Sequence, residues 1–137
     1  FLDSIKFNSV LKEGDLFIQN LKTTFKDSLI INLDDTQLIV DDYKLKFAGI
    51  VTLKFIDANN FYSHFQIGRG DRRNIKKITF GFLFNLDDEF IEVDNLKIDE
   101  NTNQNLEVFI DNFNTKKKNI LNKIIRKNLI KNFFKNL

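Results

Sequence analysis

A chain of 137 residues with 42% apolar content is long enough for one domain with a buried core. It contains sixteen Phe and no Cys, which excludes a disulfide framework, a thiolate nucleophile and a Cys-ligated zinc site. The net charge of +2 hides an asymmetry, because residues 1–115 carry a net charge of −6 and the eight basic residues from Lys116 onward have no acidic neighbour in that segment. We therefore expect one domain with a basic C-terminal segment.

Two further features of the sequence concern its origin and its relation to membranes. It contains no Met and so lacks an initiator residue, and we therefore expect it to be excised from a longer protein or processed. No run approaches the roughly 18 apolar residues of a membrane-spanning helix.

Residues 1–99 show mainly the period-two alternation of β-strands, separated by turn residues about every ten positions. The longest predicted strand is 43–55, in which one face is apolar and the other carries Lys and Thr. We expect a bulge or bend at Ala48–Gly49. The acidic pairs at 34–35, 41–42 and 87–88 are interpreted as turns rather than metal ligands, because Asp favours turns. The expected apolar layer begins with Tyr43, Leu45, Phe47, Val51, Leu53 and Phe55.

A helix near 57–66, capped by Asp57, interrupts the strands. Alternation returns at 78–86, and its apolar side chains are expected to line the same layer. They are Ile78, Phe80, Phe82 and Phe84. The predicted fold class is therefore α+β, with a curved, mostly antiparallel meander, one inserted helix and C-terminal amphipathic helices packed on the sheet.

The segment 68–73, GRGDRR, is interpreted as a helix-to-strand connector. A dinucleotide-binding loop would need a third Gly where Arg73 stands, and an Arg-Gly-Asp adhesion site rests on three letters alone. An anionic-headgroup site remains an alternative, because basic side chains cluster there. The candidate patch is Arg69, Arg72, Arg73, Lys76 and Lys77.

Residues 103–137 follow a helical period, with two apolar stripes that point in nearly opposite directions. We therefore predict a helix break near Arg126–Asn128, with Asn128 as the cap of the last helix. The helices are expected to cover the sheet, with a membrane surface as the alternative partner of the basic segment.

No combination of residues predicts an enzyme, a cofactor site or a nucleic-acid interface. His64 is the only histidine, which excludes a multi-histidine metal site. The neighbouring Ser63 points about 100° away on a helix, so a catalytic triad is not expected. We predict a partly exposed helical position for His64.

Four segments together resemble the C-terminal region of AsmA-like proteins, in the AsmA/TamB group of Gram-negative envelope proteins. The segments are KLKFAGIVTLKFID, NNFYSHFQI, IKKITFGFLFNLDDEFIEVDNLKID and LEVFIDNFN, and the similarity runs from about residue 15. The resemblance implies a non-enzymatic periplasmic domain, anchored in the inner membrane through a segment absent from this chain.

The same resemblance implies a role in outer-membrane assembly or phospholipid transport. Phospholipid, a membrane surface or other envelope proteins would then be the partners. The alternative from the residues themselves is a stand-alone β-sheet-and-helix module that binds an apolar ligand or an anionic membrane surface.

Overall fold

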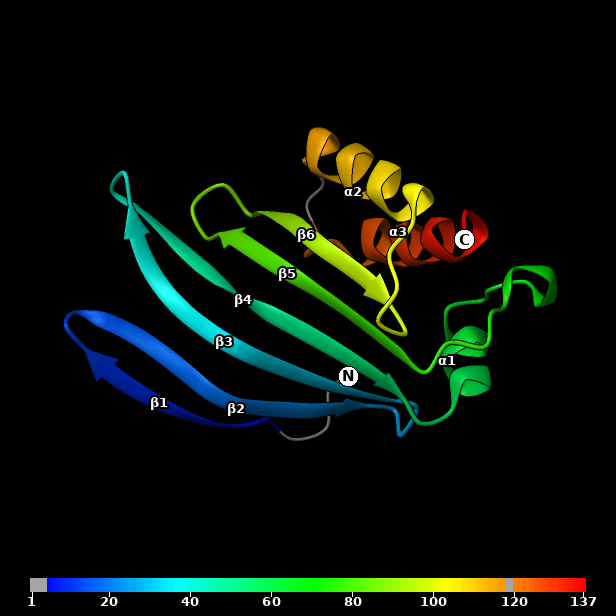
Figure 1. Cartoon of the computed structure of the whole chain (residues 1–137), viewed down its shortest axis with the longest axis horizontal. Coiled ribbons are helices and arrows are strands. Elements are labelled where there is room, and N and C mark those ends of the chain that lie inside the picture. The colour runs from blue at the N-terminus through cyan, green and yellow to red at the C-terminus, as the bar shows by residue number, and fades with distance from the viewer. Residues whose placement is uncertain (1–4, 118–119) are drawn as a thin grey trace.

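The computed structural model describes residues 5–117 and 120–137 and is an α+β fold with one antiparallel sheet (Figure 1). Each of the six strands pairs with the next along the chain, so the sheet is a meander in the order β1 to β6. This confirms the predicted fold class. The strands are β1 (Lys6–Lys12), β2 (Asp15–Phe25), β3 (Leu29–Asp41), β4 (Lys44–Phe55), β5 (Lys77–Asn85) and β6 (Phe90–Ile98).

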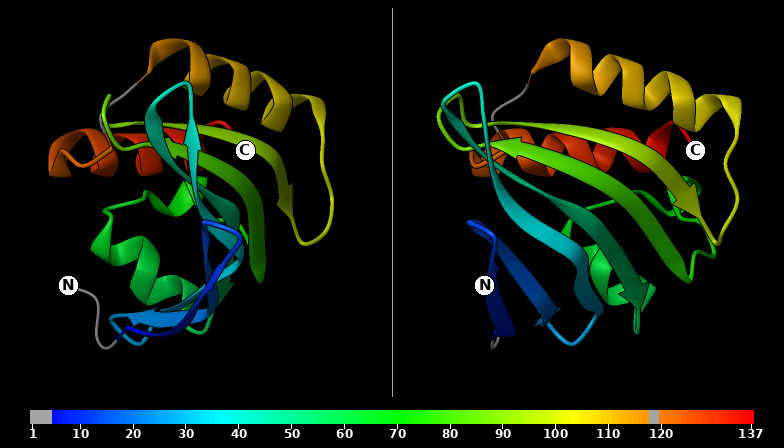
Figure 2. Two further views of the ribbon diagram at one scale, coloured as in Figure 1. Left: turned by 90° about the vertical axis from the view of Figure 1, so that its left-hand side faces the viewer. Right: turned by 60° about the vertical axis from the view of Figure 1, so that its left-hand side comes forward.

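The sheet is curved, and α1 (Ala58–His64) and α3 (Lys123–Lys135) lie on its concave side (Figure 2). Strand register explains why that side is apolar: Leu53 lies opposite Ile31 of β3 and Ile78 of β5. Directly opposite residues of antiparallel strands share a face. The polar row beside it forms part of the convex face and contains Thr52, Asn32 and Thr79.

The bend of the long hairpin is located where Gly49 faces an irregular stretch of β3. The register between β3 and β4 shifts between Asp34 and Gln37, and Asp35 adopts a positive φ of 48°. A Cβ on Gly49 would lie 2.7 Å from Thr36 Oγ1 and 3.0 Å from Thr36 Cα. The extra residue of the bulge is thus in β3, directly opposite the Ala48–Gly49 position at which a bulge or bend was predicted. Gly49 is required for close approach of the partner strand rather than for its own conformation.

The turn between β3 and β4 corrects the prediction for Tyr43. Asp42 and Tyr43 have φ angles of 48° and 61°, as in a two-residue type I′ hairpin loop. Tyr43 is therefore a turn residue, and its relative exposure is 102%. It does not belong to the apolar layer.

The other two acidic pairs differ from each other. Asp87 and Asp88 do form a turn, in which their N–H groups donate to Asn85 Oδ1 at 3.0 and 3.1 Å. The pair at 34–35 instead lies inside β3, at the bulge, because the predicted strands on either side of it are one continuous strand.

The inserted helix α1 begins where the sequence predicts. Asp57 is its N-cap, and Asp57 Oδ1 accepts from Asn60 N at 2.9 Å. The connector after it contains a short 3₁₀ turn, Arg69–Asp71. Tyr62 anchors this connector, because its hydroxyl donates to Arg73 O at 2.6 Å and its carbonyl accepts from Ile67 N at 2.8 Å.

The C-terminal region contains α2 (Gln104–Lys116) and α3, capped by Asn103 and Asn122. The predicted break near Arg126–Asn128 is wrong, since those residues lie inside α3. The break occurs earlier because Lys117 ends α2 in the left-handed conformation and the Asn122 side chain accepts two N–H groups of the next helix. The predicted stripe of Ile120, Leu121, Ile124 and Ile125 does not act as one buried face: Leu121 and Ile124 are 56% and 71% exposed, whereas Ile120 and Ile125 are half-buried.

Helix α2 lies along the edge strand β6 and satisfies part of its backbone. Asn114 Oδ1 accepts from Val93 N and Asn114 Nδ2 donates to Val93 O, each at 2.9 Å. An edge strand otherwise presents unpaired N–H and C=O groups. One amide side chain thus couples α2 to the sheet.

We predict that Asn114→Ala lowers the free energy of unfolding by about 1–3 kcal/mol, because two backbone groups of Val93 lose their partners. Asn112→Ala is the control, since its amide donates to Val108 O on the exposed side of the same helix. Urea denaturation of both variants measures the difference. Equal stabilities would show that the Asn114 contacts contribute nothing to docking of α2.

Candidate apolar binding pocket

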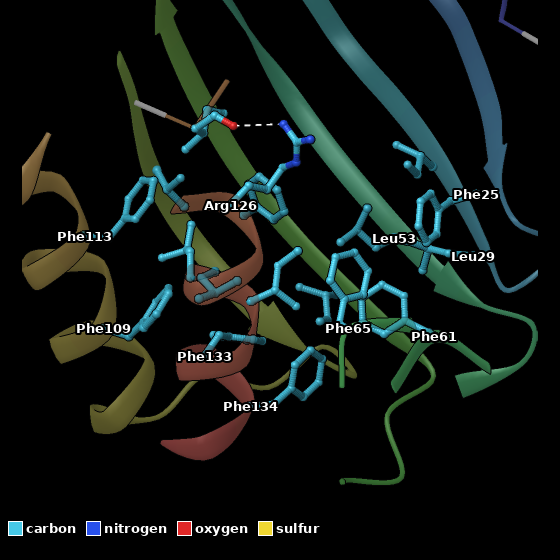
Figure 3. A pocket seen from close by; sticks show the side chains of 18 of the residues that line it. Phe25, Leu29, Leu53, Phe61, Phe65, Phe109, Phe113, Arg126, Phe133 and Phe134 are labelled. Carbon is cyan, nitrogen blue, oxygen red and sulfur yellow. Dashed lines mark hydrogen bonds between the residues drawn. The ribbon is translucent and has the colours of Figure 1, made fainter. Parts of the chain in front are cut away.

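The main candidate site is an apolar pocket between the concave face of the sheet and the three helices (Figure 3). Its volume is about 340 Å³. Twenty described residues line it, and all but Arg126 are apolar. Nine of the sixteen Phe are among them, so much of the unusual Phe content is used in this one region.

The sheet supplies the largest wall of the pocket, from the ends of β2 and β4, the beginnings of β3 and β5, and most of β6. These side chains project from one face because they occupy matched register positions, as the opposed pair Leu29 and Phe55 shows. The sheet residues of the lining are Phe25, Leu29, Ile31, Leu53, Phe55, Ile78, Phe80, Ile91, Val93 and Leu96.

Aromatic rings from α1 and α3 close one end of the pocket. The ring centroids of Phe134 and Tyr62 are 5.1 Å apart at 81°, and those of Phe134 and Phe61 are 6.0 Å apart at 63°. Phe61 in turn lies edge-on to Phe55 of the sheet, at 5.1 Å and 88°. Phe134 is only 2% exposed. These edge-to-face contacts form a continuous connection from α3 through α1 to β4.

Arg126 is the one charged residue among the described residues of the lining. It is half-buried on the first turn of α3, and Nη1 donates to Ile120 O at 3.0 Å and Leu121 O at 3.4 Å. In Figure 3 its side chain lies at the opposite end of the pocket from Phe134. The pocket therefore has an aromatic end and a cationic end.

The predicted apolar layer divides along the concave face. Four of its members line the pocket, namely Leu53, Phe55, Ile78 and Phe80. Phe47 and Phe82 lie farther along the same face, where their ring centroids are 5.5 Å apart. Leu45, Val51 and Phe84 also lie outside the lining, at positions opposite or beside these in the register.

The five cations of the candidate headgroup patch do not form one solvent-facing cluster of unengaged charges. Arg72 Nε donates to Ile67 O at 3.3 Å, and its guanidinium lies over the Tyr62 ring. Arg73 Nη1 donates to Gly70 O at 3.0 Å.

Two of the remaining members of this patch, Lys76 and Lys77, lie beside acidic residues. Lys77 forms an ion pair with Glu100, and this contact lowers the pKa of the Glu100 carboxyl. The backbone N–H groups of Lys76 and Lys77 donate to Asp99. Arg69 is exposed in the 3₁₀ turn. The side chains of Arg72, Arg73 and Lys77 thus make contacts within the protein, in the connector and with Glu100 after β6.

His64 is half-buried at the end of α1, as predicted, and its ring lies edge-on to Phe25 at 5.1 Å. Lys26 Nζ is 3.1 Å from His64 Nδ1. Burial, and then the charges of Lys26, Lys127 and Lys123, lower the pKa of His64 below its ordinary value of 6.5. The ring is therefore neutral at pH 7.

Within residues 5–117 and 120–137, no group of three or more His, Cys, Asp or Glu side chains is placed to hold a metal ion. Across the same residues, no helix has the length and apolarity needed to cross a membrane.

Sequence reasoning missed Arg126 and the β6 part of the wall. Arg126 continues the stripe of Leu129, Ile130 and Phe133 toward the N-terminus of α3, at the helical spacing of three and four residues. That spacing could have placed Arg126 on the same helix face as these residues. It was overlooked because the helix break was predicted at Arg126–Asn128. Val93 and Leu96 belong to the same face only because the register shifts along β6, which alternation alone does not reveal.

Comparisons with protein-family models, with curated proteins and with solved structures found no match to this chain.

We predict that Phe134→Ala lowers the free energy of unfolding by about 3–5 kcal/mol, because a buried aromatic side chain is removed from contact with α1. Ile124→Ala is the matched control on the same helix, where the side chain is 71% exposed. Thermal or urea unfolding of both variants checks this. A Phe134 variant as stable as the control would show that α3 is not a structural part of the wall.

Proposed function

We propose that this chain is a non-enzymatic lipid-handling domain that binds an acyl chain in the pocket between its concave sheet and its helices. The observation that carries the proposal is the lining, in which nineteen of twenty described residues are apolar. The volume of about 340 Å³ is within the range of small-molecule sites. Apolar surface removed from water contributes about 25 cal/mol per Å², so an acyl chain gains affinity from such walls.

The resemblance to AsmA-like proteins supports the same proposal. In that group a curved sheet with an apolar inner groove handles phospholipid between membranes. We infer a periplasmic role for this chain in outer-membrane assembly or phospholipid transport, with an anchor in the inner membrane outside this segment. Other envelope proteins are then its expected partners.

We predict that Ile91→Trp weakens binding of an uncharged apolar dye, N-phenyl-1-naphthylamine, at least tenfold. Ile91 lies on the sheet wall opposite Phe84, and a larger side chain there occupies the hollow. Glu92→Trp is the control, because Glu92 lies next to Ile91 on the opposite face of β6 and is exposed. Dye fluorescence titrations give both affinities. Failure of the unmodified protein to bind the dye, or equal loss in both variants, would contradict the proposed pocket.

A second candidate function, binding to an anionic membrane surface, is favoured by described residues that flank the junction of α2 and α3. Leu121 and Ile124 are exposed there, and the exposed basic residues Lys116 and Lys123 lie close to them in sequence. Exposed apolar side chains beside cations are typical of segments that lie at a lipid interface. This surface is separate from the candidate patch at residues 69–77.

The two surfaces are distinguished by vesicle sedimentation. We expect binding to phosphatidylglycerol vesicles that falls with salt and is lost in a Leu121→Asn, Ile124→Asn double variant. Replacement of all five cations of the 69–77 patch by Gln is the comparison, and we expect it to retain most binding. The reverse result would assign the membrane contact to that patch, and no preference for anionic vesicles would exclude both.

A further inference from the structure

The pocket contains one feature that an apolar-ligand site does not require, namely Arg126, a half-buried residue with a charged side chain. A charge placed among apolar side chains costs free energy unless polar groups interact with it. Two carbonyl oxygens, Ile120 O and Leu121 O, accept from its Nη1. These bonds hold the guanidinium in place at one end of the pocket, beside the start of α3.

The surroundings of this guanidinium favour an anion over a cation or a neutral polar group. The described lining includes no acidic side chain, and Lys123 lies on the same helical turn as Arg126. Apolar walls lower the local dielectric constant, so attraction between Arg126 and a negative charge is stronger there than in water.

We propose that Arg126 binds the carboxylate of a single-chain fatty acid, whose hydrocarbon lies along Leu129, Ile130 and the sheet wall. This inference rests on the proposed function, since it specifies the ligand of the same pocket. A planar guanidinium matches a carboxylate geometrically and forms charge-assisted hydrogen bonds with it. The hydrogen bonds from Arg126 to the two backbone carbonyls fix the guanidinium, and its position determines where the carboxylate of the ligand binds.

Two observations favour a fatty acid over a two-chain phospholipid as the occupant. The volume of about 340 Å³ is near the lower end of the roughly 300–1,000 Å³ of ligand sites. One guanidinium, with no second cation among the described lining residues, matches one negative charge on one ligand.

The test compares decanoate with decanol, which share a chain length and differ in charge, by isothermal titration calorimetry below their aggregation limits. We expect the unmodified protein to bind decanoate about tenfold or more tightly than decanol, because a hydrogen bond to a charged group contributes more than a neutral one. Arg126→Gln should abolish this preference, because decanoate binding should weaken until it is no tighter than decanol binding to the same variant. Arg126→Lys should retain part of it, because the charge remains but the planar fork is lost.

Lys123→Gln is the control, since it removes one positive charge from the same turn of α3 outside the pocket lining. It should keep the preference for decanoate. Circular dichroism establishes that each variant is folded. If Arg126→Gln does not fold, the unmodified protein decides: its preference for decanoate should disappear as the ligand is protonated at low pH and should fall with added salt.

The outcomes separate this inference from the proposed function. Equal affinity for decanoate and decanol in the unmodified protein would overturn the role of Arg126 and leave an apolar pocket. Binding of neither ligand would overturn both. Loss of the preference in Lys123→Gln to the same extent as in Arg126→Gln would assign it to the general charge of α3 and would overturn the specific site.

Discussion

The fold depends on the need to cover the apolar concave face of a curved sheet. Phe55 of β4, Phe61 and Tyr62 of α1 and Phe134 of α3 form one connected set of edge-to-face ring contacts, and both Tyr62 and Phe134 are 2% exposed. These contacts join segments nearly eighty residues apart in the sequence. The connector after α1 and the docking of α3 both follow from them, since Tyr62 also anchors Arg73 O.

The cover is incomplete, and the composition of the chain explains why. Phe rings are large and rigid, with two side-chain torsions, so rings that approach from a sheet and three helices leave space between them. Methionine, the residue best able to fill irregular gaps, is absent from the sequence. The hollow of about 340 Å³ is therefore a consequence of building the walls from aromatic and branched side chains. An apolar ligand would occupy this hollow.

Features that depend on neighbouring residues could be predicted from the sequence. Features that depend on contacts between segments far apart in the sequence could not. Period-two alternation identified the meander, and Asp57 identified the start of α1. Hairpin geometry places Tyr43 in a turn, and the close fit of Gly49 against Thr36 sets the position of the bulge. The alternation of apolar and polar residues predicts neither feature. Of the twenty described lining residues, the strand pattern foresaw four, namely Leu53, Phe55, Ile78 and Phe80. Arg126 was missed because the Asn122 cap, not the change of stripe, fixes where α3 begins.

The position of Arg126 also connects the two candidate functions. Its guanidinium bonds to the carbonyls of Ile120, which lines the pocket, and of Leu121, whose side chain is exposed beside Ile124. The charged end of the pocket and the proposed membrane-facing side chains thus belong to one short segment. If that segment lies on a bilayer, a fatty acid bound at Arg126 keeps its carboxylate at the interface while its hydrocarbon points toward Phe134. The fatty acid then has the same orientation in the bilayer and in the pocket, with its carboxylate at the interface. Its charge does not have to pass the apolar end of the pocket.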